Sequence, residues 1–147
     1  MAANGIYLEA QLYNSLAFRK LTRKQVGILF AFLERRQFGN GKTTKGKAAR
    51  RQIINNGEIV FTYDEAEKLG YSRRIFATAI SKLVDVGFID LTHCGNGSVK
   101  GDHSRYGFHD RWRKYGQPDF LLKVRKKDTR RSGAFDNRNK ARAARAV

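Results

Sequence analysis

The sequence is poor in cysteine, proline and acidic residues, and these shortages exclude several classes of protein. Of its 147 residues only one is cysteine, Cys94, so the chain can form neither an intramolecular disulfide nor a four-cysteine zinc site. The longest apolar stretch, residues 26–33, is far shorter than the roughly 20 residues that span a membrane. Residues 1–13 lack the basic segment and apolar run of a secretory signal. We therefore expect a cytoplasmic protein with no membrane partner.

The shortage of acidic residues leaves a large positive charge. Thirty lysines and arginines face 13 aspartates and glutamates, which gives a formal net charge of +17 at pH 7. Hydrophobic residues make up 41% of the chain, enough for the core of a single domain. A small basic domain of this kind usually binds a polyanion, and nucleic acid is the commonest one.

Two basic segments lack the apolar periodicity of a folded element. Residues 42–51 hold five basic residues and no acidic one, and residues 121–147 hold ten basic residues against two aspartates. We interpret them as a loop and a tail that an anionic partner orders, or that only aid solubility. Their candidate phosphate-binding residues are Lys42, Lys45, Lys47, Arg50, Arg51, Lys126, Lys127, Arg130 and Arg131.

Between the two basic segments and before them, the pattern is that of folded elements. Thr22 and Gln25 have the spacing of a capping box, and apolar residues follow at helical spacing, which predicts a helix over 23–37. Before this helix, residues 8–18 form an apolar segment that is either helical or an extended arm. Residues 58–61 predict a short strand.

The next stretch has the spacing of a helix-turn-helix. Thr62 and Glu65 form a second capping box, for a short helix that stops at Gly70. Ser72 can cap a longer helix that runs to Val86. Two helices joined by so short a turn are typical of a helix-turn-helix.

Two strands are predicted to follow these helices. Gly87 ends the second helix, and residues 88–93 then alternate apolar and polar side chains, as a half-buried strand does. Residues 95–104 are rich in glycine and polar residues and predict a turn. A second strand is predicted over 105–109, which completes a hairpin.

Residues 61–92 resemble the winged helix-turn-helix of bacterial, phage and plasmid DNA-binding proteins, regulators and replication initiators among them. The segment Leu83-Val-Asp-Val-Gly-Phe-Ile is similar to the Leu-x-x-x-Gly-Phe/Leu-Ile sequence that joins recognition helix and wing in many such families. The resemblance covers residues 15–110, and the insertion at 39–57 departs from it.

The resemblance implies a mainly α fold with a small β-hairpin, a winged helix-turn-helix. It implies a double-stranded DNA-binding protein that acts as a transcription regulator or a replication-associated factor of a mobile element. Helix 72–86 would read the major groove, and the wing and basic extensions would contact the backbone. Such proteins often bind as homodimers, and one bound to DNA would be nucleoid-associated. The predicted organisation is an arm over 1–21, a winged-helix domain over 22–115 and a basic tail over 116–147.

Exposed positions of the predicted recognition helix and wing are the candidates for DNA contact. Arginine can donate two hydrogen bonds to guanine, whereas threonine and serine contact either a base edge or a phosphate. The candidates on the helix are Arg73, Arg74, Thr78, Ser81 and Lys82. Those on the wing are Asn96, Ser98, Lys100, His103 and Arg105. The competing interpretation is an ordinary solvated surface.

One further segment mixes aromatic and cationic residues. Trp112 stands among Arg111, Arg113, Lys114 and Tyr115, a mixture that in single-strand binders stacks on bases. A tryptophan that closes a small core explains the same pattern, and we favour this packing role.

Signs of metal binding and catalysis are weak. The chain offers four residues of the types that bind zinc, namely His93, Cys94, His103 and His109. His93 and Cys94 are adjacent, however, so they point to opposite faces of a strand. Gly41-Lys42-Thr43 lacks the earlier glycine of a phosphate-binding loop, because Arg36 stands at that position. We therefore expect no metal, no cofactor and no enzymatic activity.

Two alternatives to a DNA-binding protein stay open. A structural RNA-binding protein, for example a ribosome-associated one, would have the same charge and basic extensions. A winged helix can also serve protein assembly. Replacement of Arg74 and Ser81 separates the DNA-binding hypothesis from the RNA-binding one, because only sequence-selective duplex binding depends on a recognition helix.

Overall fold

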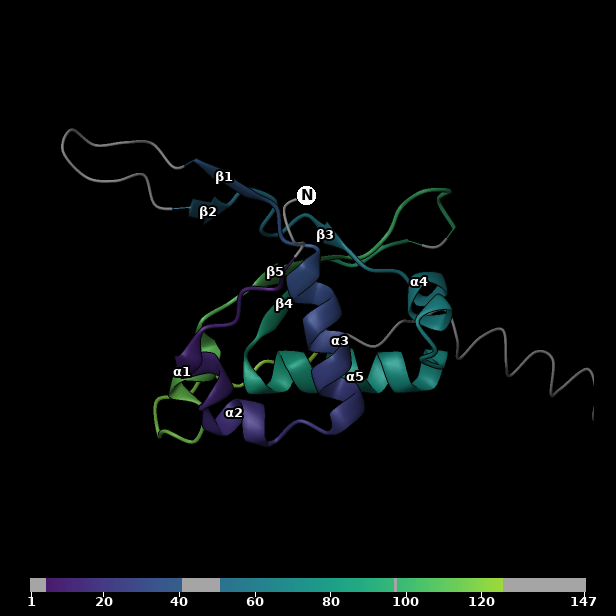
Figure 1. The fold of residues 1–147 in the computed structure, drawn as a ribbon. Helices are drawn as coiled ribbons and strands as arrows, with labels where there is room; N and C mark the ends of the chain where they lie inside the picture. The colour runs from purple at the N-terminus through teal and green to yellow at the C-terminus, as the bar shows by residue number, and fades with distance from the viewer. Residues whose placement is uncertain (1–4, 41–50, 97, 126–147) are drawn as a thin grey trace, which may run out of the picture.

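A computed structural model of the chain describes residues 5–40, 51–96 and 98–125. Its elements in chain order are α1 (Ala10–Tyr13), α2 (Leu16–Arg19), α3 (Arg23–Glu34), β1 (Phe38–Asn40), β2 (Arg51–Ile53), β3 (Ile59–Val60), α4 (Tyr63–Lys68), α5 (Arg73–Val86), β4 (Ile89–His93), β5 (Arg105–Phe108) and the 3₁₀ helix η1 (Arg111–Lys114). Helices α3 and α5 cross at the centre, and the sheet of β3, β4 and β5 lies along one side of them (Figure 1).

Helix α3 begins where the sequence predicts and ends three residues earlier. Thr22 accepts from the Gln25 N–H at 3.4 Å and Gln25 accepts from the Thr22 N–H at 2.9 Å, so the predicted capping box is confirmed. The helix ends at Glu34 because Asn55 turns the chain there. The Asn55 side-chain Nδ2 donates to the Arg35 carbonyl at 2.9 Å, and its Oδ1 accepts from the Gln37 backbone N–H at 2.9 Å.

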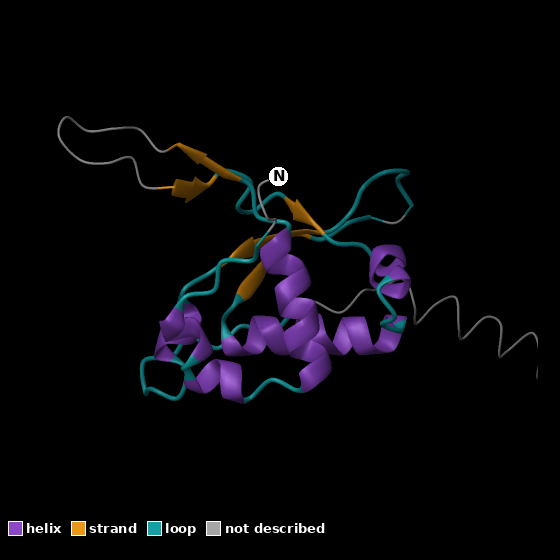
Figure 2. Cartoon of the chain, viewed as in Figure 1, coloured by secondary structure: helices purple, strands orange, loops and turns teal. Residues whose placement is uncertain are grey.

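The sequence predicts the basic insertion as a loop, but the two ends of the insertion pair with each other as strands. Strands β1 and β2 are antiparallel, with Phe38 opposite Ile53. The pair projects from the body of the molecule as a two-stranded arm (Figure 2). Candidate residues Lys42, Lys45, Lys47 and Arg50 lie between the two strands and outside the described residues, whereas Arg51 begins β2.

Helices α4 and α5 confirm the predicted helix-turn-helix spacing. Thr62 and Glu65 form the expected capping box, and the Ser72 hydroxyl accepts from the Ile75 N–H at 3.3 Å to cap α5. Gly70 lies between them with a φ of 91°. The inner face of α5 is buried and consists of Phe76, Ala79, Ile80, Leu83, Val84 and Val86.

Gly87 ends α5 for two reasons. Its φ of 93° is in the left-handed region that favours glycine. In addition, a Cβ at this position would lie 2.7 Å from the Arg111 Cβ and 2.7 Å from the Trp112 backbone nitrogen. The chain can therefore bring η1 against the end of α5 only because residue 87 has no side chain.

The sheet contains one strand more than the predicted hairpin. Its order is β3-β5-β4, all antiparallel, with Ile59 opposite Tyr106 and Ile89 opposite Phe108. The described residues thus form a mixed α/β fold of helices and small antiparallel sheets. The expectation of a mainly α fold with a small hairpin is met in its coarse features. The short strand predicted over 58–61 is β3, whereas the β1–β2 pair was not predicted.

The core is aromatic where α3, α5 and the sheet meet. The Phe32 ring lies 5.0 Å from the Phe61 ring and 5.2 Å from the Tyr106 ring, both edge-on, and Phe61 lies 4.7 Å from Phe76. Edge-to-face pairs of this kind are favourable beyond the apolar area that they bury. They fix the crossing of α3 on α5 and thereby the orientation of the outer face of α5.

The segment before α3 is helical rather than extended. Helices α1 and α2 bury Leu12 and Ala17 in the main core, and α2 contacts η1. Trp112 is 6% exposed and stacks on Phe88 at 5.8 Å, which confirms the favoured packing role. In the three described ranges no helix combines the length and the apolarity that crossing a membrane requires.

Candidate nucleic-acid interface

The outer face of α5 presents a stripe of polar residues four positions apart. Arg74 and Thr78 are exposed and Lys82 is half-buried. Residues four apart in a helix lie on one face, so the three side chains form a row opposite the buried face. Neither Arg74 nor Lys82 forms an ion pair with any residue that the structure describes. Their charges are therefore available to an anion.

The two hydroxyl residues of α5 donate to their own helix. The Thr78 hydroxyl donates to the Arg74 carbonyl at 2.9 Å, and the Ser81 hydroxyl donates to the Ala77 carbonyl at 3.0 Å. A hydroxyl has one proton and two acceptor sites. Because the proton is used within the helix, both side chains are prepared to accept a hydrogen bond from a ligand and not to donate one.

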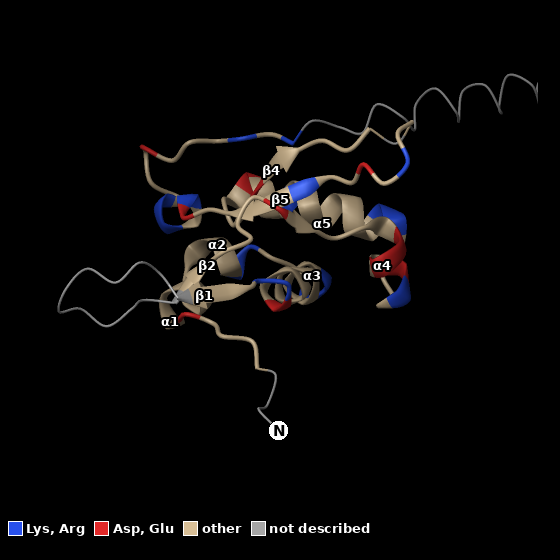
Figure 3. Ribbon diagram, turned by 90° about the horizontal axis from the view of Figure 1, so that it is seen from above, with Lys and Arg blue, Asp and Glu red and all other residues tan. Residues whose placement is uncertain are grey.

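Arg73 is in a different position from Arg74. Its guanidinium contacts Asp64 through Nη2 and Glu67 through Nε at 3.1 Å, and it lies 5.7 Å from the centre of the Tyr63 ring. All three partners belong to α4. Arg73 therefore ties α4 to the start of α5, and two carboxylates already balance its charge. Figure 3 shows these acidic residues on α4 flanked by basic ones.

The sequence contains a signal for the pairing of Arg73 with the acidic residues of α4. Asp64 and Glu67 stand three positions apart in the predicted short helix, so they share one face of it. The helix that begins at Arg73 follows after only four residues. Acids on one face of α4, so close to the start of α5, indicate a partner among its first residues.

The loop between β4 and β5 is stabilised from within. Asp102 accepts from the Asn96 backbone N–H at 2.7 Å and pairs with His93 Nε2 at 2.7 Å. The hydrogen bond from Asn96, followed by that from His93, holds the pKa of the Asp102 carboxyl below its ordinary value. Gly95 donates to the Ser104 hydroxyl across the loop at 3.1 Å. Residues 98–101 of the loop form a turn, which we call the loop tip.

Some of the predicted wing residues have partners within the described chain, and others are exposed. The Asn96 side chain accepts from the Ser98 N–H at 3.0 Å, and Arg105 pairs with Glu58 at 2.9 Å. Lys100 is exposed at the tip and pairs with no described residue. Among the predicted wing candidates, Lys100 is therefore the one whose charge the described chain does not balance, and Ser98 and His103 are exposed beside it.

A groove of about 750 Å³ separates the loop from α4 and the start of α5. Both of its walls carry both signs of charge: Asp64, Glu65 and Arg73 line the helix side, and Lys100 and Asp102 line the loop side. A groove of mixed charge does not attract phosphate along its length. The anion-attracting surface is therefore the outer face of α5 together with the loop tip, and not the space between them.

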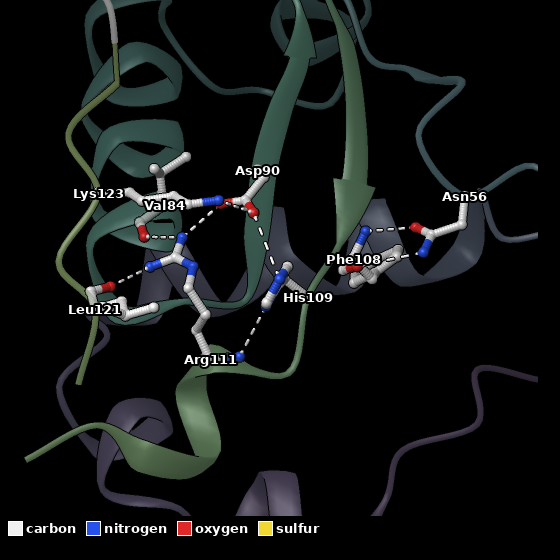
Figure 4. A network of polar contacts seen from close by, with 8 residues as sticks. All are labelled: Asn56, Val84, Asp90, Phe108, His109, Arg111, Leu121 and Lys123. Carbon is white, nitrogen blue, oxygen red and sulfur yellow. Dashed lines mark hydrogen bonds and ion pairs between the residues drawn. The ribbon is translucent and has the colours of Figure 1, made fainter. Parts of the chain in front are cut away.

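Arg111 is a structural residue. Its side chain is 5% exposed, and Figure 4 shows it between α5, β4 and the segment after η1. It donates to the carbonyls of Val84 and Leu121, both at 3.0 Å, and contacts the Asp90 carboxylate. Lys123 also reaches Asp90 at 2.9 Å. The segment around residues 121–123 is thereby fixed beside α5.

The balance of effects on Asp90 follows from this network. Burial acts to raise the pKa of the Asp90 carboxyl, but hydrogen bonds from Lys123 and Arg111 outweigh burial and hold the pKa below its ordinary value of 3.8.

The other cations near Trp112 also form ion pairs with acidic side chains. Arg113 pairs with Glu9 at 2.9 Å, and Lys114 pairs with Asp119.

The remaining candidates do not gather at one place. Tyr71, in the turn between α4 and α5, is a further residue that could contact a phosphate, but it packs toward the core, and its hydroxyl lies where a side chain at Gly27 of α3 would stand. His93 is bonded to Asp102, and the His109 Nδ1 accepts from the Arg111 N–H at 3.1 Å. No three histidine, cysteine or acidic residues of the described ranges group as a metal site would need. Candidates Lys126, Lys127, Arg130 and Arg131 lie outside the described residues.

Comparison of the chain with protein-family models, with curated proteins and with solved structures finds no match.

Proposed function

We propose that the protein binds double-stranded DNA through a winged-helix unit made of α3, β3, α4, α5, β4 and β5. In this unit α5 is the recognition helix and the β4–β5 loop is the wing. The order of the elements and the sheet order β3-β5-β4 support the proposal. A helix with one face buried on α3 and the other exposed is able to enter a major groove, which accepts one α-helix.

The observation that carries the proposal is the row of Arg74, Thr78 and Lys82 on the exposed face of α5. Arg74 is unpaired within the described residues and stands at the start of the helix, where recognition helices contact base edges. Its planar guanidinium suits guanine O6 and N7. Thr78, which is prepared to accept a hydrogen bond, suits the exposed amino group of adenine or cytosine. Lys82 and Lys100 would contact phosphates.

The biological role that we propose is that of a transcription regulator or a replication-associated factor of a mobile element. Both roles require selective binding to one DNA site among many. A homodimer on a site with two half-sites is the arrangement that such domains commonly use. The proposal assigns no catalytic step to the chain.

A comparison of substitutions at the neighbouring residues Arg73 and Arg74 tests the proposal. Arg74→Ala should lower the affinity for the preferred duplex by about 10-fold to 100-fold, the worth of a bidentate contact to guanine, and relax the base preference at one position. Arg73→Ala removes the same charge from a residue held by Asp64 and Glu67, so its effect on affinity should be much smaller. Fluorescence anisotropy with labelled duplex measures both, and circular dichroism shows that both variants are folded.

Equal losses for the two variants would contradict the proposal, because a surface that attracts DNA only through its net charge does not distinguish them. Tight binding to structured RNA that neither substitution changes would favour the RNA-binding alternative instead. RNA duplexes do not offer an open major groove to a helix.

A further inference from the structure

A second group of basic residues lies at the junction of α2 and α3. Arg19 ends α2, Lys20 follows it, and Arg23 and Lys24 begin α3. All four side chains are exposed, and none forms an ion pair with a carboxylate of the described residues. The sequence itself explains this, because no aspartate or glutamate occurs between Glu9 and Glu34. We call these four residues the junction patch.

Stability of the fold does not explain two residues of the junction patch, Arg23 and Lys24. Arg23 and Lys24 occupy the first turn of α3, which contains no acidic residue. The peptide dipoles of a helix make its N-terminus partly positive, so cations there are unfavourable and acids favourable. The capping box of Thr22 and Gln25 already occupies backbone groups at this end. Arg23 and Lys24 are therefore long cationic side chains whose position opposes the dipole of α3, whereas Arg19 and Lys20 lie at the C-terminal end of α2, where cations are favourable.

The junction patch lies close to the turn that leads into α5. Arg23 is four residues before Gly27 and so lies on the same face of α3, one helical turn away. The Tyr71 hydroxyl is in contact with Gly27, since a Cβ there would lie 2.2 Å from the hydroxyl oxygen. Tyr71 directly precedes Ser72, the cap of α5. One turn of α3 and the Tyr71 side chain therefore lie between Arg23 and the end of α5 that carries Arg74. The junction patch lies at the end of α3 remote from the sheet (Figure 1).

We propose that the junction patch binds the phosphate backbone of the same duplex whose major groove α5 reads, on the strand that flanks the start of α5. This inference rests on the proposed function and extends it from base recognition to a second, sequence-independent contact. Arginine and lysine on phosphates position a protein on DNA but do not select a sequence. The patch should therefore contribute to affinity and to its salt dependence, and not to the base preference.

The test uses paired substitutions of equal charge in the full-length protein. Arg23→Gln with Lys24→Gln removes two charges from the patch, and Arg113→Gln with Lys114→Gln removes two charges that the fold already balances. Each phosphate contact adds about 0.9 to the slope of log affinity against log salt. The first pair should lower this slope by about 2 and weaken binding, whereas the second pair should leave it near the wild-type value. Replacement of all four patch residues should lower the slope by about 3 to 4.

Two controls separate the outcomes. The DNA sequence selected from a random duplex pool should be the same for wild type and for the patch variants. The melting temperature of the Arg23→Gln, Lys24→Gln variant should equal or exceed that of the wild type, because two charges that oppose the helix dipole are gone. Weaker binding by this variant then reflects lost contacts and not unfolding.

Equal slopes for the two paired variants, with a wild type that binds duplex selectively, would overturn this inference and leave the proposed function standing. A wild type that selects no duplex would remove the proposed function itself. A slope that changes with structured RNA and not with duplex would assign the patch to RNA and overturn the inference as stated.

Discussion

Asp90 lies at the centre of a polar network that joins β4, η1 and the segment after η1 (Figure 4). It balances Arg111, whose guanidinium is buried beside the end of α5, and it also holds Lys123 at 2.9 Å. A buried charge that loses its partner is costly, whereas the intact pair contributes little net stability. We therefore expect the carboxylate to matter because of the cation that it balances.

Replacement of Asp90 tests this with a pH dependence of known sign. Asp90→Asn should lower the free energy of unfolding by roughly 2 kcal/mol near neutral pH, because Arg111 keeps its carbonyl partners but loses the opposite charge. The folded-state pKa of Asp90 lies below 3.8, so the stabilisation is complete above that value and is lost as the pH falls through the lower folded-state pKa. Urea unfolding across the acid range measures the difference between the two proteins.

The difference should therefore disappear at the acid end, where Asp90 is protonated and resembles asparagine. Asp110→Asn is the matched control, since the Asp110 side chain is 79% exposed and should change stability by less than about 0.5 kcal/mol. A difference for Asp90→Asn that stays constant from neutral pH to acid would contradict the account of this network.

At the residue scale, the sequence predicts which residues are candidates for the site, but it does not predict which of their side chains are buried or already paired. Arg73 and Arg74 are indistinguishable in sequence, and both were predicted to contact DNA. Only the packing of α4 against α5 shows that acids hold Arg73 and leave Arg74 exposed. Arg111 stands among other cations and has no local sign of burial, because its partners Val84 and Asp90 are more than 20 residues away.

Helix caps set the ends of the elements that carry the candidate interface. Thr62 accepts from the Glu65 N–H at 3.2 Å, and Glu65 accepts from the Thr62 N–H at 2.8 Å. The bond from the Thr62 backbone holds the pKa of the Glu65 carboxyl below its ordinary value, which burial opposes. Since α4 supplies the acids that hold Arg73, its start also determines how α5 is placed.

Two threonine substitutions test the contribution of the cap. Thr62→Ala should lower the free energy of unfolding by about 1 kcal/mol, the usual cost of losing an N-cap side chain. Thr78→Ala is the control in the middle of α5, where the hydroxyl only bonds back to the helix and alanine has the higher helix propensity. Urea unfolding should show no loss for it. Losses of the same size at both positions would mean that Thr62 has no capping role.

At the scale of elements, local signals in the sequence were reliable and long-range pairing was not. Capping residues and apolar spacing predicted α4 and α5, since these contacts span three or four residues. The pairing of β1 with β2 joins the two ends of an insertion that reads as a polar loop. Strand β3 has only two residues and is recognisable as part of the sheet only by its pairing with β5.

In the molecule as a whole, acidic and basic residues are not mixed evenly. Several acids of the described residues hold cations of the fold, as Asp64 and Glu67 hold Arg73 and Glu9 holds Arg113. Cations without such partners occur on the outer face of α5, at the loop tip and in the junction patch. A net charge of +17 that the fold does not need is the property that a polyanionic partner would explain.

The central claim is that α5 reads the sequence of double-stranded DNA, and selection from a random duplex pool tests it most directly. Wild-type protein should enrich one consensus, and anisotropy should show that duplex bound at least about 1,000-fold more tightly than random duplex. The preference should persist between about 50 and 300 mM salt, while absolute affinity falls. A pool that yields no consensus, with equal or tighter binding to structured RNA, would contradict the account.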